Sequence, residues 1–126
     1  MIVDNGEPDR EATAAMLHSL GYRVDTEANG PRALRLFSEA PNDYDLAIIE
    51  PLLPDLGGLS LGLRFRDIRP GFPVLFYAGY VDMSLSRRIE AAGFERVAFK
   101  PSMLGELAAA VKDLKVYGPL PIAFAQ

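Results

Sequence analysis

The feature that most constrains this chain is a regular alternation of short apolar runs with longer segments whose apolar residues have helical spacing. Five apolar runs are expected to be strands: residues 1–4, 22–27, 45–49, 74–78 and 96–99. Consecutive parallel strands need a crossover of about a dozen residues, which is usually a helix. The alternation therefore predicts an α/β fold of five βα units, with a parallel sheet and helices on both of its faces.

The residues between these runs carry signals for helix starts and stops. Gly21 and Gly93 follow the first and fourth helical segments, where glycine commonly ends a helix. Pro31 suits the first turn of the second helix, because its missing N–H would be unpaired there in any case. Ser102 is expected to be the N-cap of a fifth, strongly amphipathic helix that runs to Leu114.

The segment between the third and fourth strands is the least regular. Its apolar residues alternate as in a strand, and they are Leu59, Leu61, Leu63 and Phe65. Gly62 would cost a helix about 1 kcal/mol relative to alanine. A helix is nevertheless predicted, because the segment must cross over between two parallel strands. Its arginines are expected to form a solvated face, and they are Arg64, Arg66 and Arg69.

Length and composition exclude several classes of protein. The chain has 126 residues, which suits one domain, and we assign residues 1–115 to it and 116–126 to an apolar, proline-containing tail. The net charge of −4 argues against a nucleic-acid partner, and the lack of cysteine excludes disulfides and thiolate sites. No signal stretch or run of about 18 apolar residues occurs, so no membrane association and a cytoplasmic location are expected.

Ligands of parallel α/β sheets gather at the carboxyl ends of the strands, and five chemically informative residues are expected there. They are Asp4 and Asn5 after the first strand, Glu50 after the third, Ala78 after the fourth and Lys100 after the fifth. Two simpler interpretations stay open: Asp4 and Asn5 could form an ordinary turn, and Lys100 could be solvated. No G-x-G-x-x-G, Walker A or Ser–His–Asp pattern occurs, and no enzymatic activity is expected.

Several short motifs, taken in order and spacing, resemble the receiver domain of response regulators over residues 2–114. They are Val3-Asp4-Asn5-Gly6-Glu7, Leu20-Gly21-Tyr22, Asn29-Gly30, Tyr44-Asp45-Leu46, Leu53-Pro54-Asp55-Leu56-Gly57-Gly58, Phe72-Pro73-Val74 and Lys100-Pro101. The resemblance implies a flavodoxin-like, doubly wound sheet of five parallel strands in the order 2-1-3-4-5. It also implies a role in two-component phosphorelay signalling.

In that family an aspartate after the third strand accepts a phosphoryl group, and two acidic residues after the first strand help to hold Mg²⁺. A Ser or Thr after the fourth strand and a Lys after the fifth bind the phosphoryl oxygens, and an aromatic residue on the fifth strand acts as a switch. This chain keeps only Asp4 and Lys100. The departures are Glu50 at the phosphoacceptor position, Asn5 at an acidic position, Ala78 at the hydroxyl position and Val97 at the switch position.

These departures predict a receiver without phosphorylation. Asp4, Glu50 and Lys100 sum to a charge of −1, against −2 for the family pocket. A Glu50–Lys100 pair is favoured and would compete with a metal, so any Mg²⁺ at Asp4 and Glu50 is expected to bind weakly, and no other cofactor is expected. Glu50 would partly mimic the phosphorylated form.

The favoured function is therefore a pseudo-receiver: a protein-interaction module, or a homodimer, that uses the face of the fourth helix, fifth strand and fifth helix. That face is expected to include Arg87, Arg88 and Phe94. The sequence does not indicate which histidine kinase, if any, acts on this domain. The alternatives are a working phosphoacceptor with altered chemistry and a flavodoxin-like domain that binds a small molecule.

Overall fold

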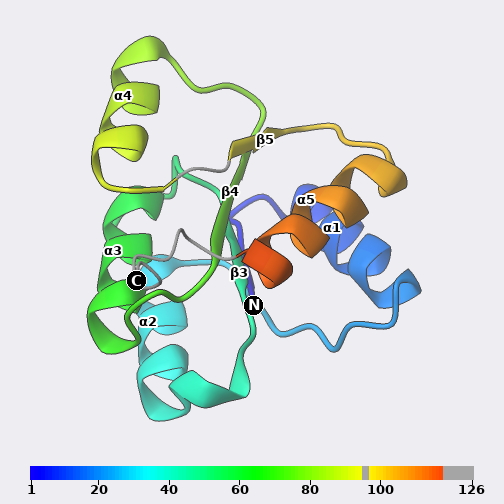
Figure 1. The fold of residues 1–126 in the computed structure, drawn as a ribbon, viewed down its shortest axis with the longest axis horizontal. Coiled ribbons are helices and arrows are strands. Elements are labelled where there is room, and N and C mark those ends of the chain that lie inside the picture. Colours follow the sequence, from blue (N-terminus) through cyan, green and yellow to red (C-terminus); the bar gives the residue numbers. More distant parts are fainter. Residues whose placement is uncertain (95–96, 118–126) are drawn as a thin grey trace.

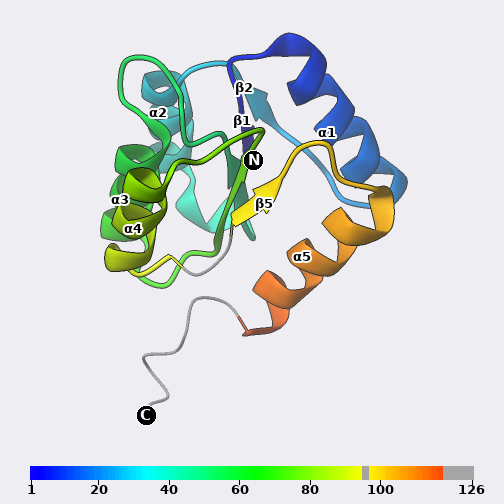
Figure 2. The same ribbon diagram turned by 90° about the horizontal axis from the view of Figure 1, so that it is seen from above.

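The computed structural model describes residues 1–94 and 97–117, the last three by their backbone alone. Within this part of the chain, parallel strands form one sheet in the order β2-β1-β3-β4-β5 (β3 to β5 are labelled in Figure 1, β1 and β2 in Figure 2). The strands are β1 (Ile2–Val3), β2 (Thr26–Glu27), β3 (Ala47–Ile49), β4 (Val74–Ala78) and β5 (Val97–Phe99). The helices are α1 (Glu7–Ser19), α2 (Gly30–Glu39), α3 (Gly58–Ile68), α4 (Met83–Ala91) and α5 (Leu104–Tyr117), with a 3₁₀ turn at η1 (Pro41–Asp43). The predicted fold class and strand order are confirmed.

The sheet separates two apolar cores, because successive strand residues point to opposite faces. On one face Ile49 and Phe76 pack against α2, α3 and α4, where Phe37 and Phe65 stack with their ring centroids 4.2 Å apart. On the other face Ile48 and the rest of the second core pack against α1 and α5. Figure 2 shows these two helical layers on either side of the strands.

The segment with strand-like alternation is a helix, α3, as the crossover argument predicted. Leu61 and Phe65 are one helical turn apart and fully buried, whereas Leu63 points away and is exposed. Gly62 lies between them, against the rings of Phe76 and Phe94. A Cβ added at Gly62 would lie 3.1 Å and 3.2 Å from those two rings, so a close helix–sheet approach explains a glycine inside this helix.

Several local boundaries differ from the sequence predictions. Strand β1 is limited to Ile2–Val3 and does not fill residues 1–4, and β3 begins at Ala47 and not at residue 45. The second strand is limited to Thr26–Glu27 and does not begin at residue 22. The predicted N-cap Ser102 is wrong: its hydroxyl donates to the carbonyl of Phe99, and α5 begins later, at Leu104. Glu106 accepts a hydrogen bond from the N–H of Met103 instead, so a side chain within the helix satisfies a backbone donor at its start. Arg96, predicted to open the fifth strand, lies outside the described residues.

The arginines of α3 are not a simple solvated face. Arg64 is exposed, but Arg66 donates to the carbonyls of Phe72 and Gly93. Arg69 donates to the carbonyls of Pro41 and Tyr44. The expectation is therefore corrected: two of the three arginines join the end of α3 to neighbouring loops, because loop carbonyls without strand partners need other donors.

Helix α5 is the last described element, and it continues through Tyr117. Residues 118–126 of the predicted tail lie outside the described residues. Among the helices that the structure describes, none combines the length and the apolar character needed to cross a membrane.

Candidate functional site

The candidate site lies at the carboxyl edge of the sheet, where Asp4, Glu50 and Lys100 follow β1, β3 and β5. The backbone ladder holds these residues in place. The N–H of Glu50 donates to the carbonyl of Val3 at 2.9 Å, and the N–H of Lys100 donates to the carbonyl of Ala78 at 2.8 Å. The ends of three strands thus bring together side chains that are up to 96 residues apart in the sequence.

The centre of the site is the ammonium group of Lys100. Its Nζ lies 2.7 Å from Oδ2 of Asp4, 3.0 Å from Oε1 of Glu50 and 3.3 Å from Oδ2 of Asp9. An ammonium carries three donor protons, so these carboxylates match its full capacity. The expected Glu50–Lys100 pair is present, and the solvated-lysine interpretation is wrong because the Lys100 side chain is only 12% exposed.

Asp9 is a site residue that the sequence reasoning missed. It lies in the first turn of α1, and its side chain is 61% exposed, so it forms the open side of the cluster. An acidic residue in the first turn of the helix that follows β1 was the available signal, since acids are favoured at helix N-termini. Counting Asp9, the three carboxylates and Lys100 sum to a formal charge of −2.

The two inner carboxylates have further partners that hold them in place. Oδ1 of Asp4 accepts a hydrogen bond from the N–H of Gly6 at 2.9 Å. Oε2 of Glu50 accepts one from the N–H of Leu52 at 3.0 Å. Each of these carboxylates therefore uses one oxygen for Lys100 and the other for a backbone donor, which leaves little freedom to rotate.

The electrostatics keep Lys100 charged. Burial by itself lowers the pKa of Lys100, since it disfavours the ammonium form. The hydrogen bonds and negative charges of Asp4 and Glu50 together outweigh burial and raise the pKa above its ordinary value of 10.5. Lys100 is thus a permanent cation at the centre of the site at any physiological pH.

The site does not fit the Mg²⁺ ion that the fold family implies. Within the part of the chain that the structure describes, no three His, Asp or Glu side chains are arranged to hold a metal ion. The carboxylates of Asp4, Asp9 and Glu50 converge on the Lys100 ammonium instead, so a protein cation occupies the place where they meet. Asn5, at the family's second acidic position, is exposed and has no carboxylate to add.

The remaining predicted positions are placed as follows. Ala78 ends β4 beneath the site, fully buried and without a hydroxyl, and Val97 is half-buried against the core on the α2–α3–α4 side. Arg87 and Arg88 are exposed on α4, as expected. Phe94 is not on the expected interaction face: it is 2% exposed, because its ring packs edge-on against Phe76 and beneath Arg66.

The loop that follows Glu50 requires a glycine. A Cβ added at Gly58, the first residue of α3, would lie 2.2 Å from the carbonyl oxygen of Glu50 and 2.5 Å from Cα of Pro51. The helix therefore starts in direct contact with the backbone that carries Glu50. The loop motif that ends at Gly58 thus also fixes the backbone from which the Glu50 carboxylate extends.

Comparisons with known proteins agree with this fold. The family described as response regulator receiver domain matches residues 1–112. The sensor kinase CckA of Brucella abortus is 26% identical over 90% of this chain, but the chain spans only 12% of that protein's length. The response regulator receiver protein CpdR of Brucella abortus is 22% identical, covering 92% of this chain and 95% of that protein. A CheY-like receiver domain protein from Methanospirillum hungatei superimposes with a TM-score of 0.82 at 26% identity, covering 91% of this chain and 90% of that one.

Proposed function

Because this chain belongs to the response regulator receiver domain family, we propose that it serves two-component signalling as a protein-interaction module whose state does not depend on phosphorylation. In this proposal the domain is not an enzyme and acts in the cytoplasm. The observation that carries the proposal is the engagement of Glu50, whose two carboxylate oxygens bind the Lys100 ammonium and the N–H of Leu52.

Phosphoryl transfer to a carboxylate needs an available oxygen nucleophile and cations that neutralise the charge on the phosphoryl oxygens. Here the nucleophile position is a glutamate that is hydrogen-bonded through both oxygens. The cation that would meet the phosphoryl group, Lys100, is already saturated by three carboxylates. Ala78 offers no hydroxyl, so three of the parts needed for the reaction are missing or occupied.

The same contacts support a domain held in one state. Glu50 keeps a negative charge beside Lys100 without any modification, as a phosphoryl group would. Val97 has no ring to move between the site and the surface, so the aromatic relay of the family has no counterpart at that position. The charge on Glu50 then acts as a constant structural feature and not as a signal.

Phosphodonor labelling tests this proposal. The chain is incubated with acetyl phosphate and Mg²⁺, and its intact mass is measured. We expect no species heavier by one phosphoryl group at Glu50. A matched variant with Glu50→Asp, Asn5→Asp and Ala78→Thr restores the family residues and should accept label. Substantial labelling of Glu50 in the unmodified chain would establish the alternative, a phosphoacceptor with altered chemistry.

The proposed interaction surface is the face of α4, β5 and α5. Large apolar side chains are exposed on this face and on its flanking loops, all at least 43% exposed: Tyr80, Met83, Phe99, Met103 and Leu104. Arg87 and Arg88 add positive charge beside them. Exposed apolar groups beside charged ones are typical of protein–protein interfaces, so a protein partner or a second copy of the chain is proposed.

A titration against an isolated partner, or sedimentation if the partner is a second copy, tests the surface. Phe99→Asp should abolish binding, whereas Leu63→Asp, an equal change at an exposed residue of α3, should leave it unchanged. Glu50→Gln removes the charge beside Lys100, and a linked site should change affinity by about 1–3 kcal/mol. Equal affinity for the wild type, Glu50→Gln and Glu50→Asp, with folding intact, would make Glu50 a structural residue only.

A further inference from the structure

The chain contains three asparagines, and two of them precede a glycine. The pairs are Asn5-Gly6, Asn29-Gly30 and Asn42-Asp43. Asparagine is chemically labile in proteins, because the backbone nitrogen of the next residue can attack its side-chain carbonyl carbon. Glycine favours this attack, since it has no side chain to shield the nitrogen and lets the backbone turn. The sequence therefore marks Asn5 and Asn29 equally, and their surroundings in the fold distinguish them.

The side chain of Asn5 is held by no other group that the structure describes. Asn5 lies in the loop between β1 and α1, just past the last hydrogen bond of β1 to β2, from the N–H of Asp4 to the carbonyl of Glu27 (Figure 2). Asn5 is exposed, and among the described residues its side chain has no hydrogen-bond or ion-pair partner. Rotation of its amide toward the next backbone nitrogen therefore breaks no bond among these residues.

The backbone nitrogen of Gly6 is not blocked by its own hydrogen bond. Gly6 is half-buried and is the extended N-cap of α1, with φ −89° and ψ 110°. Its N–H donates to Oδ1 of Asp4 at 2.9 Å. That N–H lies in the peptide plane, whereas the nitrogen attacks with electrons perpendicular to the plane. The bond to Asp4 therefore does not occupy the direction of attack.

Asn29 is held by the helix that it caps. Its Oδ1 accepts a hydrogen bond from the N–H of Arg32 at 2.9 Å, as an N-cap side chain does. Gly30 is buried against Leu56: a Cβ added at Gly30 would lie only 3.0 Å from Cβ of Leu56. Closing a ring between Asn29 and Gly30 would break the cap and move a packed residue, so the fold protects this pair.

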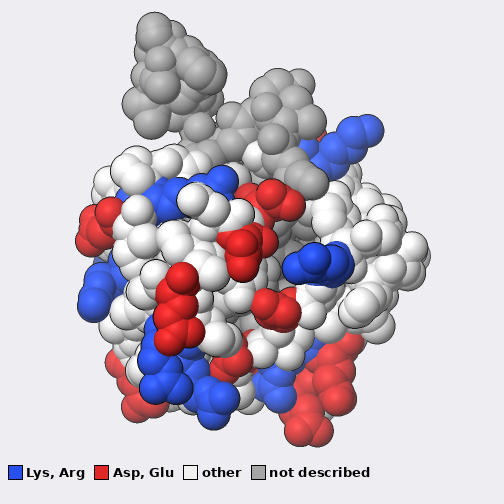
Figure 3. Space-filling model, turned by 90° about the horizontal axis from the view of Figure 1, so that it is seen from below, with Lys and Arg blue, Asp and Glu red and all other residues white. Residues whose placement is uncertain are grey.

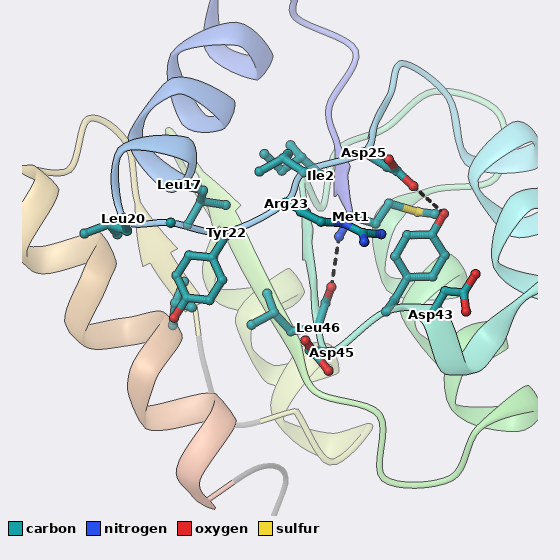
Figure 4. Close-up of a pocket in the computed structure, with 14 residues that line it drawn as sticks. Met1, Ile2, Leu17, Leu20, Tyr22, Arg23, Asp25, Asp43, Asp45 and Leu46 are labelled. Atoms are coloured by element: carbon teal, nitrogen blue, oxygen red, sulfur yellow. Dashed lines mark hydrogen bonds between the residues drawn. The ribbon is translucent and has the colours of Figure 1, made fainter.

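Asn42 is protected by its helical turn and by the residue after it. The N–H of Asp43 donates to the carbonyl of Ala40 at 3.1 Å within η1, and Asp43, unlike glycine, has a side chain beside that nitrogen. This end of the molecule already carries negative charge, as the acidic side chains near the middle of Figure 3 show. Asp43 lines the cavity at the amino edge together with Asp25 and Asp45 (Figure 4). A further carboxylate at residue 42 would therefore change the local charge little.

We propose that Asn5 is a spontaneous modification site, whose deamidation adds a carboxylate at the carboxyl edge of the sheet while Asn29 and Asn42 stay intact. The Gly6 nitrogen forms a bond to Cγ of Asn5, and the bond from Cγ to Nδ2 breaks. The proton lost by the Gly6 nitrogen leaves with the amide group as ammonia, and a five-membered imide remains. Water then opens the imide at either carbonyl, which gives aspartate or isoaspartate at position 5.

The new carboxylate lies next to the Lys100 cluster. A Cβ added at Gly6 would be 3.4 Å from Oδ1 of Asp4 and 3.8 Å from Oδ2 of Asp9, so the reacting peptide borders both carboxylates. Deamidation changes the formal charge of the cluster together with residue 5 from −2 to −3. It also supplies an acid at position 5, where the receiver family has one and this sequence does not. The inference rests on the Asn5-Gly6 pair and not on the proposed pseudo-receiver function, so labelling at Glu50 would leave it standing.

Ageing of the intact chain at neutral pH, followed by mass spectrometry, tests the proposal. Trypsin at mildly acidic pH releases the three asparagines in separate peptides, residues 1–10, 24–32 and 36–64. We expect Asn5 to lose its amide several-fold faster than Asn29 in the folded chain, and the product to show the acidic shift of the Asn5→Asp variant in ion exchange. In urea, where the packing is lost, the two Asn-Gly pairs should react at similar rates.

Gly6→Ala is the matched variant, because its Cβ would meet only ordinary contacts and should leave the fold intact. It shields the attacking nitrogen and should slow the reaction of Asn5 several-fold without changing that of Asn29. Equal rates for Asn5 and Asn29 in the folded wild type would overturn the proposal, as would an unchanged rate in a folded Gly6→Ala chain. Circular dichroism checks folding, and if Gly6→Ala does not fold, the comparison of folded with urea-unfolded wild type decides alone.

Discussion

Replacing Lys100 by methionine removes the ammonium group and keeps a side chain of similar length. Three carboxylate oxygens, at 2.7, 3.0 and 3.3 Å from the former nitrogen, then face one another without a cation. Removing one partner of a buried ion pair costs about 3–5 kcal/mol. Asp9 is 61% exposed and is screened by water, so we expect a loss in the free energy of unfolding of about 2–4 kcal/mol.

Urea unfolding followed by circular dichroism measures this loss. With an m value of about 2 kcal/mol/M, the middle of the usual range for small proteins in urea, the midpoint should fall by about 1–2 M. Lys112→Met is the matched control, because Lys112 is exposed on α5 and such surface changes stay within about 0.5 kcal/mol. If Lys100→Met is as stable as Lys112→Met, the carboxylates do not depend on the ammonium group and the account of the site is wrong.

The stability of the Lys100→Met variant should also respond to Mg²⁺, and its difference from the wild type should depend on pH in a defined way. In the Lys100→Met variant, Mg²⁺ should raise the unfolding midpoint, because three oxygen ligands have lost their cation, whereas Mg²⁺ should leave the wild type unchanged. The pKa of Lys100 is raised above 10.5 in the folded state. Its stabilisation is therefore fully present below about pH 10.5 and is lost only as the pH rises through the folded value. The stability difference between wild type and variant should be constant from neutral pH to about pH 10.

Three further predictions concern the scaffold. Gly58→Ala should lower the free energy of unfolding by about 1–3 kcal/mol, because the added Cβ would collide with the backbone of Glu50. Gly105→Ala lies in open space on α5 and should raise the free energy of unfolding by about 0.5–1 kcal/mol. Urea unfolding of the two variants measures both changes. Burial, and then the hydrogen bond to Asp25, raise the pKa of Tyr44 to about 12. The stabilisation from neutral Tyr44 is therefore present below pH 10 and is lost as the pH rises through 12. Ultraviolet titration should detect a tyrosine that ionises near pH 12, and Asp25→Asn should lower the pKa of Tyr44. Arg66→Met should lower stability by about 1–3 kcal/mol, since two loop carbonyls lose their donor, and an unchanged thermal midpoint would contradict that role.

Much of the fold could be predicted because hydrophobic periodicity is a local property. Strand β4 was predicted at its observed bounds, since five consecutive buried residues make an unambiguous run. Strand β2 was predicted four residues too long, because Tyr22 and Val24 are apolar for a different reason: they pack against the core on the α1–α5 side and do not pair in the sheet. Apolar character alone does not distinguish these two uses.

The sequence by itself determined the order of strands and helices, the identity of the residues at the carboxyl edge, and the loss of the hydroxyl and the aromatic switch at Ala78 and Val97. The order and the identities follow from residue types and spacing, and the two losses follow from the resemblance of the motifs to the receiver family. Only the tertiary structure decided that Asp9 joins Asp4 and Glu50 around Lys100, and that Phe94 is buried and not on the surface. The physical reason is that these contacts join residues up to 96 positions apart, whose distances are set by how strands and helices pack.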